Sequence, residues 1–94
     1  MPKSADKETS LFIANEADHK TIYDYSKLVG RIIEKYGTRE NFAKAFGCSV
    51  EHLSKFLNNK WYLKQPGIDK MCRLLDIPDN EIYYYFFVKV VQTA

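Results

Sequence analysis

The stretch that most constrains the fold of this 94-residue chain is TRENFAKAFGCSVEHLSKFLNNK, at residues 38–60. Its apolar pattern indicates two short helices that meet at Gly47, the residue type that takes a left-handed turn without a steric penalty from Cβ. Ser49 stands at the expected N-cap of the second helix, where its hydroxyl can accept a hydrogen bond from a free backbone amide. The apolar face of that helix has the spacing i, i+3, i+4 and consists of Leu53, Phe56 and Leu57. The pattern predicts a helix-turn-helix.

The face of the second helix opposite this apolar stripe carries residue types that can contact DNA. It spans an arc of about 120° and contains Val50, Glu51, Ser54, Lys55 and Asn58. Lys55 can donate to guanine or to a phosphate, Ser54 can bond to most base edges, and Val50 can pack against a thymine methyl group. Glu51 can accept from a cytosine amino group. Its alternative role is electrostatic, because an acid in the first turn stabilises the helix dipole.

The chain resembles the Cro/CI-type helix-turn-helix domains of bacteriophage and bacterial repressors, and is most similar to a small phage-repressor-like branch. Four segments in this order carry the resemblance over roughly residues 22–91: YDYSKLVGRIIEKYGT, NFAKAFGCS, LSKFLNNK and YYYFFVKVVQ. It implies a lambda-repressor-like fold and operator binding through the second helix of the motif. Two departures bear on the target sequence rather than on the fold. Arg39 stands where many relatives carry glutamine, and Glu51 places a negative charge on the face expected to meet DNA.

The periodicity outside the motif predicts three further helices, and therefore an all-α domain of five helices. A Thr-x-x-Asp signal at Thr21 starts the first, Gly37 ends it, and Gly30 inside it would permit close helix contact. Another amphipathic helix repeats Ile68, Met71, Cys72 and Leu75 and is stopped by Pro78, and a short one covers NEIYYYFF with Asp79 as its cap. WYLKQPG between them is expected to be a loop.

We therefore divide the chain into a flexible N-terminal arm at 1–20, the helix-turn-helix domain at 21–78, and an aromatic C-terminal extension at 79–94. The arm contains an apolar patch, Leu11–Ala14, which is either free, docked on the domain or docked on a partner. The ending VKVVQ is either a short strand or a loose tail.

The aromatic run of the extension exceeds what one core can bury, since five consecutive residues wrap around a helix. Exposed apolar surface usually marks an interface, and a two-fold dimer is the commonest arrangement. We expect a homodimer with an interface formed by Tyr83, Tyr84, Phe86 and Phe87. The alternative is that Ile82, Phe86 and Phe87 complete the core while the tyrosines stay half-exposed.

Charge is unevenly distributed along the chain. Residues 25–73 hold ten lysines and arginines against four aspartates and glutamates, whereas both flanks are slightly acidic. A basic middle suits contact with phosphates, which release counterions when they are neutralised. The alternative is an ordinary solvated helical surface. The candidate DNA-binding residues are Arg39, Ser49, Val50, Glu51, Ser54, Lys55, Asn58, Asn59, Lys60 and Lys64, with His52 ranked below them and Trp61 interpreted as a packing anchor.

Several classes of protein find no support in the sequence. It has no glycine-rich phosphate loop, no H-E-x-x-H and no Cys-x-x-Cys pair, so we expect neither an enzyme nor a bound cofactor or metal. Cys48 and Cys72 fall at apolar helical positions and are interpreted as reduced core residues. MPKSADKETS lacks the apolar run of a secretory signal, and no stretch has the roughly 20 apolar residues of a membrane span. We expect a cytoplasmic location in a bacterial host cell.

These observations predict a transcriptional regulator, a Cro/CI-like repressor, that binds double-stranded operator DNA as a homodimer and needs no small-molecule substrate or membrane. The alternative keeps the all-α fold and changes the function. In it the chain is a protein-interaction module, such as an antirepressor or an antitoxin, that binds another regulator through its arm and its tyrosine-rich end.

Overall fold

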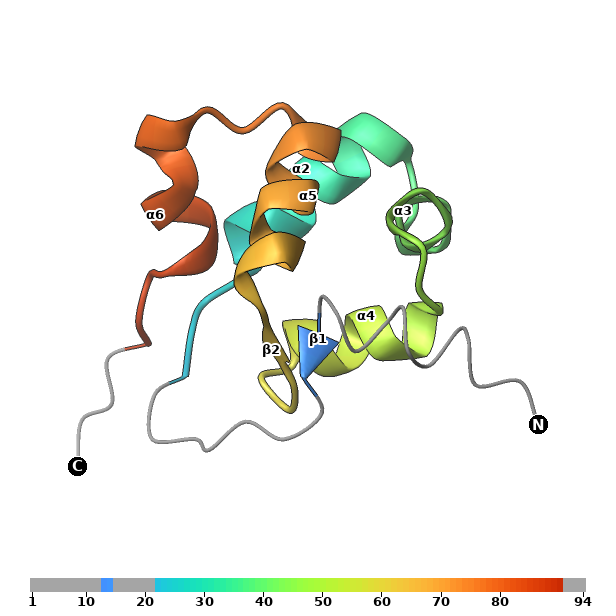
Figure 1. Ribbon diagram of the computed structural model, residues 1–94, viewed down its shortest axis with the longest axis horizontal. Helices are drawn as coiled ribbons and strands as arrows, with labels where there is room; N and C mark the ends of the chain where they lie inside the picture. Colours follow the sequence, from blue (N-terminus) through green and yellow to red (C-terminus); the bar gives the residue numbers. More distant parts are fainter. Residues whose placement is uncertain (1–12, 15–21, 91–94) are drawn as a thin grey trace.

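The computed structural model describes residues 13–14 and 22–90. Within them five α-helices enclose one core, and two short strands pair beside α4 (Figure 1). In chain order the elements are β1 (Ile13–Ala14), α2 (Ser26–Tyr36), α3 (Arg39–Phe46), α4 (Val50–Leu57), β2 (Tyr62–Leu63), α5 (Gln65–Leu75), the 3-10 helix η1 (Asp79–Glu81) and α6 (Ile82–Phe86). The predicted all-α class is confirmed. None of the described helices has the length and hydrophobicity that a membrane span requires.

The core is built from the apolar stripes that the sequence predicts. Each of α2, α3, α4 and α5 contributes two side chains that are at most 1% exposed: Leu28, Ile32, Phe42, Phe46, Leu53, Phe56, Met71 and Leu75. Burial of one such side chain stabilises the fold by about 1.5–3 kcal/mol. In Figure 1, α2 and α5 cross at the centre, with α3 on one side and α6 on the other. The helix-turn-helix and the aromatic extension therefore lie on different sides of the domain.

The first helix begins later than its sequence signal predicts. α2 starts at Ser26, whose backbone N–H donates to the Asp24 carboxylate at 2.9 Å, and this hydrogen bond lowers the pKa of Asp24. The prediction of a helix start at Thr21 is wrong, because residues 22–24 are extended and pair with the C-terminal segment. Gly30 also differs from expectation, since a Cβ placed there would meet no heavy atom within 4 Å. It mediates no close helix contact.

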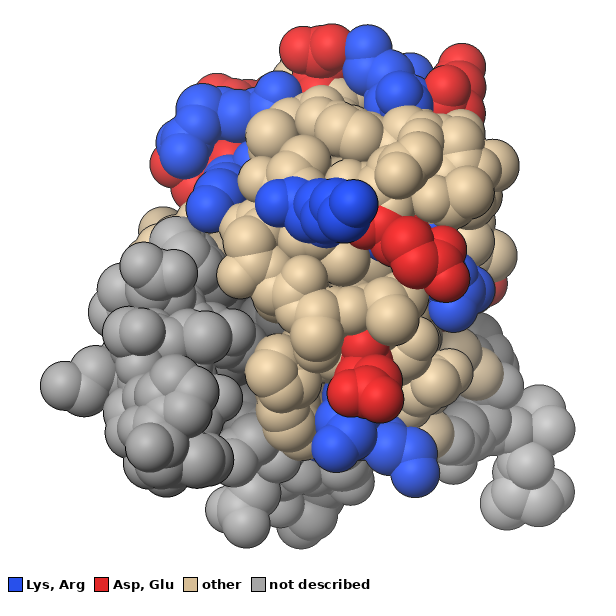
Figure 2. Space-filling model, turned by 90° about the vertical axis from the view of Figure 1, so that its right-hand side faces the viewer, with Lys and Arg blue, Asp and Glu red and all other residues tan. Residues whose placement is uncertain are grey.

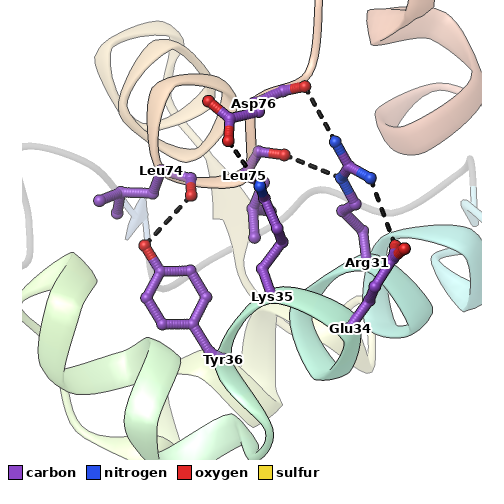
Figure 3. Close-up of polar contacts among 7 residues, drawn as sticks. All are labelled: Arg31, Glu34, Lys35, Tyr36, Leu74, Leu75 and Asp76. Carbon is purple, nitrogen blue, oxygen red and sulfur yellow. Dashed lines mark hydrogen bonds and ion pairs between the residues drawn. The ribbon is translucent and has the colours of Figure 1, made fainter.

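Side chains of α2 hold the last turn of α5 (Figure 3). Arg31 Nε donates to the carbonyl oxygen of Leu75 at 2.8 Å, and its Nη2 donates to that of Asp76 at 3.1 Å. The Tyr36 hydroxyl donates to the carbonyl oxygen of Leu74 at 3.1 Å. A helix leaves its last four carbonyl groups without intrahelical partners. Residues of α2 therefore cap α5 from outside.

The end of α5 lies before the predicted stop at Pro78. Asp76 takes a positive φ of 54°, which terminates the helix directly after Leu75. The Asp76 carboxylate lies 2.6 Å from the Lys35 ammonium, and the hydrogen bond and charge of Lys35 lower the pKa of Asp76. The prediction of Asp79 as a helix cap is wrong, because Asp79 is the first residue of η1, whose N-cap is Pro78, and the N-cap of α6 is Glu81.

Two short stretches of extended chain join the ends of the described chain to the helical body. β1 pairs antiparallel with β2, with Ile13 opposite Leu63 and Ala14 opposite Tyr62. This part of the predicted apolar patch is docked on the domain, and the rest of the predicted arm lies outside the described residues. The segment WYLKQPG is more regular than the predicted loop, because it contains β2 and because α5 begins within it, with Pro66 in its first turn.

The second stretch is a single antiparallel bridge between Tyr23 and Lys89. The N–H of Asp24 donates to the carbonyl of Val88 at 2.7 Å, and that of Val90 donates to Ile22 at 2.8 Å. Of the two alternatives for VKVVQ, residues 88–90 form this isolated bridge and not a full strand, and the last residues of the segment lie outside the described part.

Candidate functional site: the helix-turn-helix surface

The segment predicted to be a helix-turn-helix consists of α3, the turn at residues 47–49 and α4. Thr38 and Ser49 cap the two helices, because their hydroxyls accept from the backbone N–H groups of Asn41 and His52 at 3.0 and 3.1 Å. Gly47 has a φ of 99°, in the left-handed region, and its N–H donates to the carbonyl of Ala43. The turn at Gly47 and the cap at Ser49 are confirmed as predicted.

The outward side of α4 is mostly accessible. Glu51, Lys55 and Asn58 are exposed, and Ser54 is half-buried. Val50 is also half-buried and packs against the core cluster, so only part of its surface is left for a ligand. Glu51 and Lys55 are one turn apart on the same side, which gives this surface one acid and one base rather than a continuous positive charge.

Trp61, just beyond α4, organises two side chains of that helix. The Lys55 ammonium lies 5.0 Å from the centroid of the Trp61 ring, a cation–π distance. The His52 ring is tilted against the same indole, with the ring centroids 4.8 Å apart, and its Nδ1 is buried without a hydrogen-bond partner. Trp61 is a packing anchor, as predicted, and it also sets the direction of Lys55. The sequence alone gave no signal for this pairing beyond the presence of an aromatic residue after the helix.

Asn59 has a structural role that differs from its predicted contact with DNA. Its Oδ1 accepts from the backbone N–H of Tyr23 and its Nδ2 donates to the Tyr23 carbonyl, both at 2.9 Å. Its φ is 64°, a left-handed value that asparagine tolerates better than most residues. The side chain is therefore occupied inside the domain, and its geometry does not favour a DNA contact. The signal available in the sequence was the known preference of asparagine for such turns.

The remaining predicted contact residues are distributed around the motif. Arg39 is the first residue of α3 and is half-buried, whereas Lys60 is exposed in the turn after α4. Lys64 is exposed at the N-cap position of α5 and is separated from that turn by β2. The fold thus brings together the residues of α4 and its following turn, but places Arg39 and Lys64 on neighbouring elements.

The charge on the side of the molecule that carries α3 is mixed. Figure 2 shows lysines and arginines interspersed with aspartates and glutamates around a broad uncharged area. Within the described part of the chain, ion pairs join Arg31 to Glu34, Lys35 to Asp76, and Arg73 to Asp69. The basic excess of the middle segment therefore does not form a uniform positive stripe on this face.

The exposed aromatic surface lies elsewhere, on α6. We call Tyr83, Tyr84 and Phe87 the α6 patch, because their exposed fractions are 62%, 54% and 37%. Lys27 of α2 lies over the Tyr84 ring at 5.1 Å from its centroid. Phe86 is only 2% exposed and belongs to the core, so its predicted place in an interface is wrong. A short helix turns only one face toward the core. In α6 that face carries Phe86.

Cys48 and Cys72 are free thiols, half-buried and buried respectively. Burial raises the pKa of Cys48 from its ordinary 9.0 to about 11. Such a thiol is a poor nucleophile at neutral pH. Both residues fit the predicted packing role.

Comparison with known proteins places this geometry in a family. No curated protein matches the chain. The solution structure of the modulator of repression (MOR) of the temperate bacteriophage TP901-1 from Lactococcus lactis is 45% identical, with a TM-score of 0.63. The match covers 69% of this chain and 88% of that one. Residues 21–89 match the family described as "Protein of unknown function (DUF739)", so the chain belongs to the DUF739 family.

Proposed function

We propose that this protein modulates phage gene expression by binding another regulatory protein through the α6 patch. The observation that carries the proposal is the separation of surfaces. The helix-turn-helix side has mixed charge, whereas α6 presents two tyrosines that are more than half exposed. Tyrosine is enriched at the centres of protein interfaces, where single residues can dominate the binding energy. The similarity to a phage modulator of repression supports a role beside a repressor.

A second candidate function is operator binding through α4, with the chain as a homodimer and half-sites about 34 Å apart. The observation that favours it is the capped helix-turn-helix with Glu51 and Lys55 exposed on its outward side. In this case the α6 patch would join the two copies. Repression would then follow from occlusion of the promoter, without a cofactor.

One experiment with three variants separates the two functions. The binding partners are the repressor encoded by the same phage and the intergenic DNA that this repressor recognises. Replacing both patch tyrosines (Y83A/Y84A) is expected to weaken binding to the repressor by more than 10-fold, since an interface tyrosine often contributes over 1 kcal/mol. Tyr62→Ala is the matched control, because Tyr62 is also an exposed tyrosine, at 47%, but lies on β2.

The third variant, R39A/K55A, removes the two cations most suited to DNA. We expect it to bind the repressor as the unchanged chain does. If the unchanged chain instead binds the DNA alone, with an affinity that falls steeply between about 50 and 200 mM salt and is lost in R39A/K55A, operator binding is the function. Equal repressor binding by Y83A/Y84A and Tyr62→Ala would refute the role of the patch.

A further inference from the structure

The bridge between residues 22–24 and 88–90 leaves two backbone edges. Its hydrogen bonds join Asp24 to Val88 and Val90 to Ile22, so Tyr23 and Lys89 are the central, non-hydrogen-bonded pair. In such a pair the N–H and C=O groups of both residues point away from each other. One set faces α4 and the other faces outward.

The inner edge is filled by the Asn59 side chain, which bonds to both the N–H and the C=O of Tyr23. The outer edge is not filled in the same way. Within the described chain, the backbone N–H and C=O of Lys89 take part in no hydrogen bond. The two groups are spaced like those of Tyr23, so they fit the same two-bond contact that Asn59 makes on the other side.

The surroundings of this edge are accessible and apolar. Val90 is 42% exposed and its cross-strand neighbour Ile22 is 38% exposed. Lys89 itself is exposed. An exposed edge with unpaired backbone groups and β-branched neighbours is a template for another strand.

We propose that the outer edge of residues 88–90 binds an extended segment of a partner protein that carries an aspartate or glutamate opposite Lys89. The contact is a strand addition, in which main-chain hydrogen bonds give affinity and side chains give selectivity. A second copy is a poorer occupant, because antiparallel self-pairing centred on Lys89 would set two lysines directly opposite each other. This inference rests on the proposed function, because it takes the partner to be another protein. It adds the chemistry of the partner segment that makes the contact.

The probes are two peptides, acetyl-TVEVT-amide and acetyl-TVKVT-amide, titrated into the isotope-labelled full chain and followed by amide NMR. The glutamate peptide is expected to shift the amides of residues 88–90 and 22–24 and to bind roughly two- to five-fold more tightly than the lysine peptide. In Lys89→Glu the preference is expected to reverse.

A pair of proline variants tests the geometry. Lys89→Pro removes only an N–H that has no partner among residues 13–14 and 22–90, so the fold is expected to be kept and peptide binding to be lost. Val90→Pro removes the N–H that bonds to Ile22 and is the matched control for damage to the bridge. Its spectrum is expected to change around residues 22–24 without any peptide.

Two results would overturn the proposal: equal binding of the glutamate peptide to Lys89→Pro and to the unchanged chain, or self-association of the chain that Lys89→Pro abolishes. Failure here is separable from failure of the proposed function. If repressor binding survives in Lys89→Pro but is lost in Y83A/Y84A, the proposed function stands and the strand addition is not part of it. If the glutamate peptide binds but the repressor does not, the strand addition at residues 88–90 stands and the proposed function is wrong.

Discussion

Arg31 is expected to be the polar side chain on which the stability of this domain most depends. Its guanidinium donates to the carbonyl groups of Leu75 and Asp76 at 2.8 and 3.1 Å, and its side chain is only 24% exposed. Hydrogen bonds that involve a charged group are worth roughly 1.5–3 kcal/mol each. Two such bonds at the lower end of this range would together contribute about 3 kcal/mol. The site is partly open, so water replaces part of this contribution in the variant, and we expect Arg31→Ala to cost about 2–3 kcal/mol in the free energy of unfolding.

The assay is urea and thermal unfolding followed by circular dichroism, with the single tryptophan, Trp61, as a second probe. In a domain of this size, 1 kcal/mol shifts Tm by roughly 4–8 °C, so Arg31→Ala is expected to melt at least about 8 °C lower. Arg31→Lys keeps the charge but cannot place two donors in a fork. The Tm of Arg31→Lys is expected to lie between that of Arg31→Ala and that of the unchanged chain.

Arg73→Ala is the matched control. Arg73 also forms an ion pair, with Asp69 at 2.8 Å, but both side chains are about 70% exposed, at 68% and 73%. Pairs of this kind contribute about 0–1 kcal/mol. If Arg31→Ala and Arg73→Ala lower the stability by the same amount, the carbonyl groups of α5 do not depend on Arg31, and the reasoning from external capping is refuted.

Three further predictions follow from the same geometry. Asn59→Ala removes both hydrogen bonds to Tyr23 and is expected to cost about 1–3 kcal/mol in urea unfolding, whereas Asn58→Ala, one residue earlier and exposed, is expected to change little. Ser49→Ala removes the cap of α4 and is expected to cost about 1 kcal/mol; a Ser49→Asp variant that is equally unstable would contradict the capping role. Burial that raises the pKa of Cys48 to about 11 is expected to slow its alkylation by iodoacetamide at pH 8 about 100-fold relative to the unfolded chain. The same shift contributes stability that is fully present below pH 9 and is lost as the pH rises towards 11. Measurements of unfolding between about pH 8 and 11 test this.

The helix-turn-helix could be predicted from the sequence because its determinants are local. Thr38 and Ser49 cap helices within three residues of their own positions, and Gly47 takes a backbone angle that few other residues allow. The apolar stripe of α4 follows from a spacing that one turn of helix fixes. None of these features needs a partner far away in the chain.

The roles of several single residues could not be predicted, because they depend on contacts between distant segments. Asn59 is bound to Tyr23, 36 positions earlier. Its polar neighbours in the sequence suggest an exposed turn and do not indicate this contact. The sequence signal at Thr21 predicts too early a start for α2 for the same reason, since residues 22–24 pair with residues 88–90 instead of forming a helical turn. Tertiary hydrogen bonds outweigh a weak local start signal.

By itself, the sequence determined that the chain is all-α, where the helix-turn-helix lies, and that the aromatic run is too long for one core. Only the tertiary structure decided which of those aromatic residues is buried, that Asn59 faces the domain rather than a ligand, and that the positive charges on the face that carries α3 are mixed with negative ones. Periodicity and capping act within one or two helical turns. Charge patterns and backbone edges depend instead on how helices far apart in the chain are brought together in the folded domain.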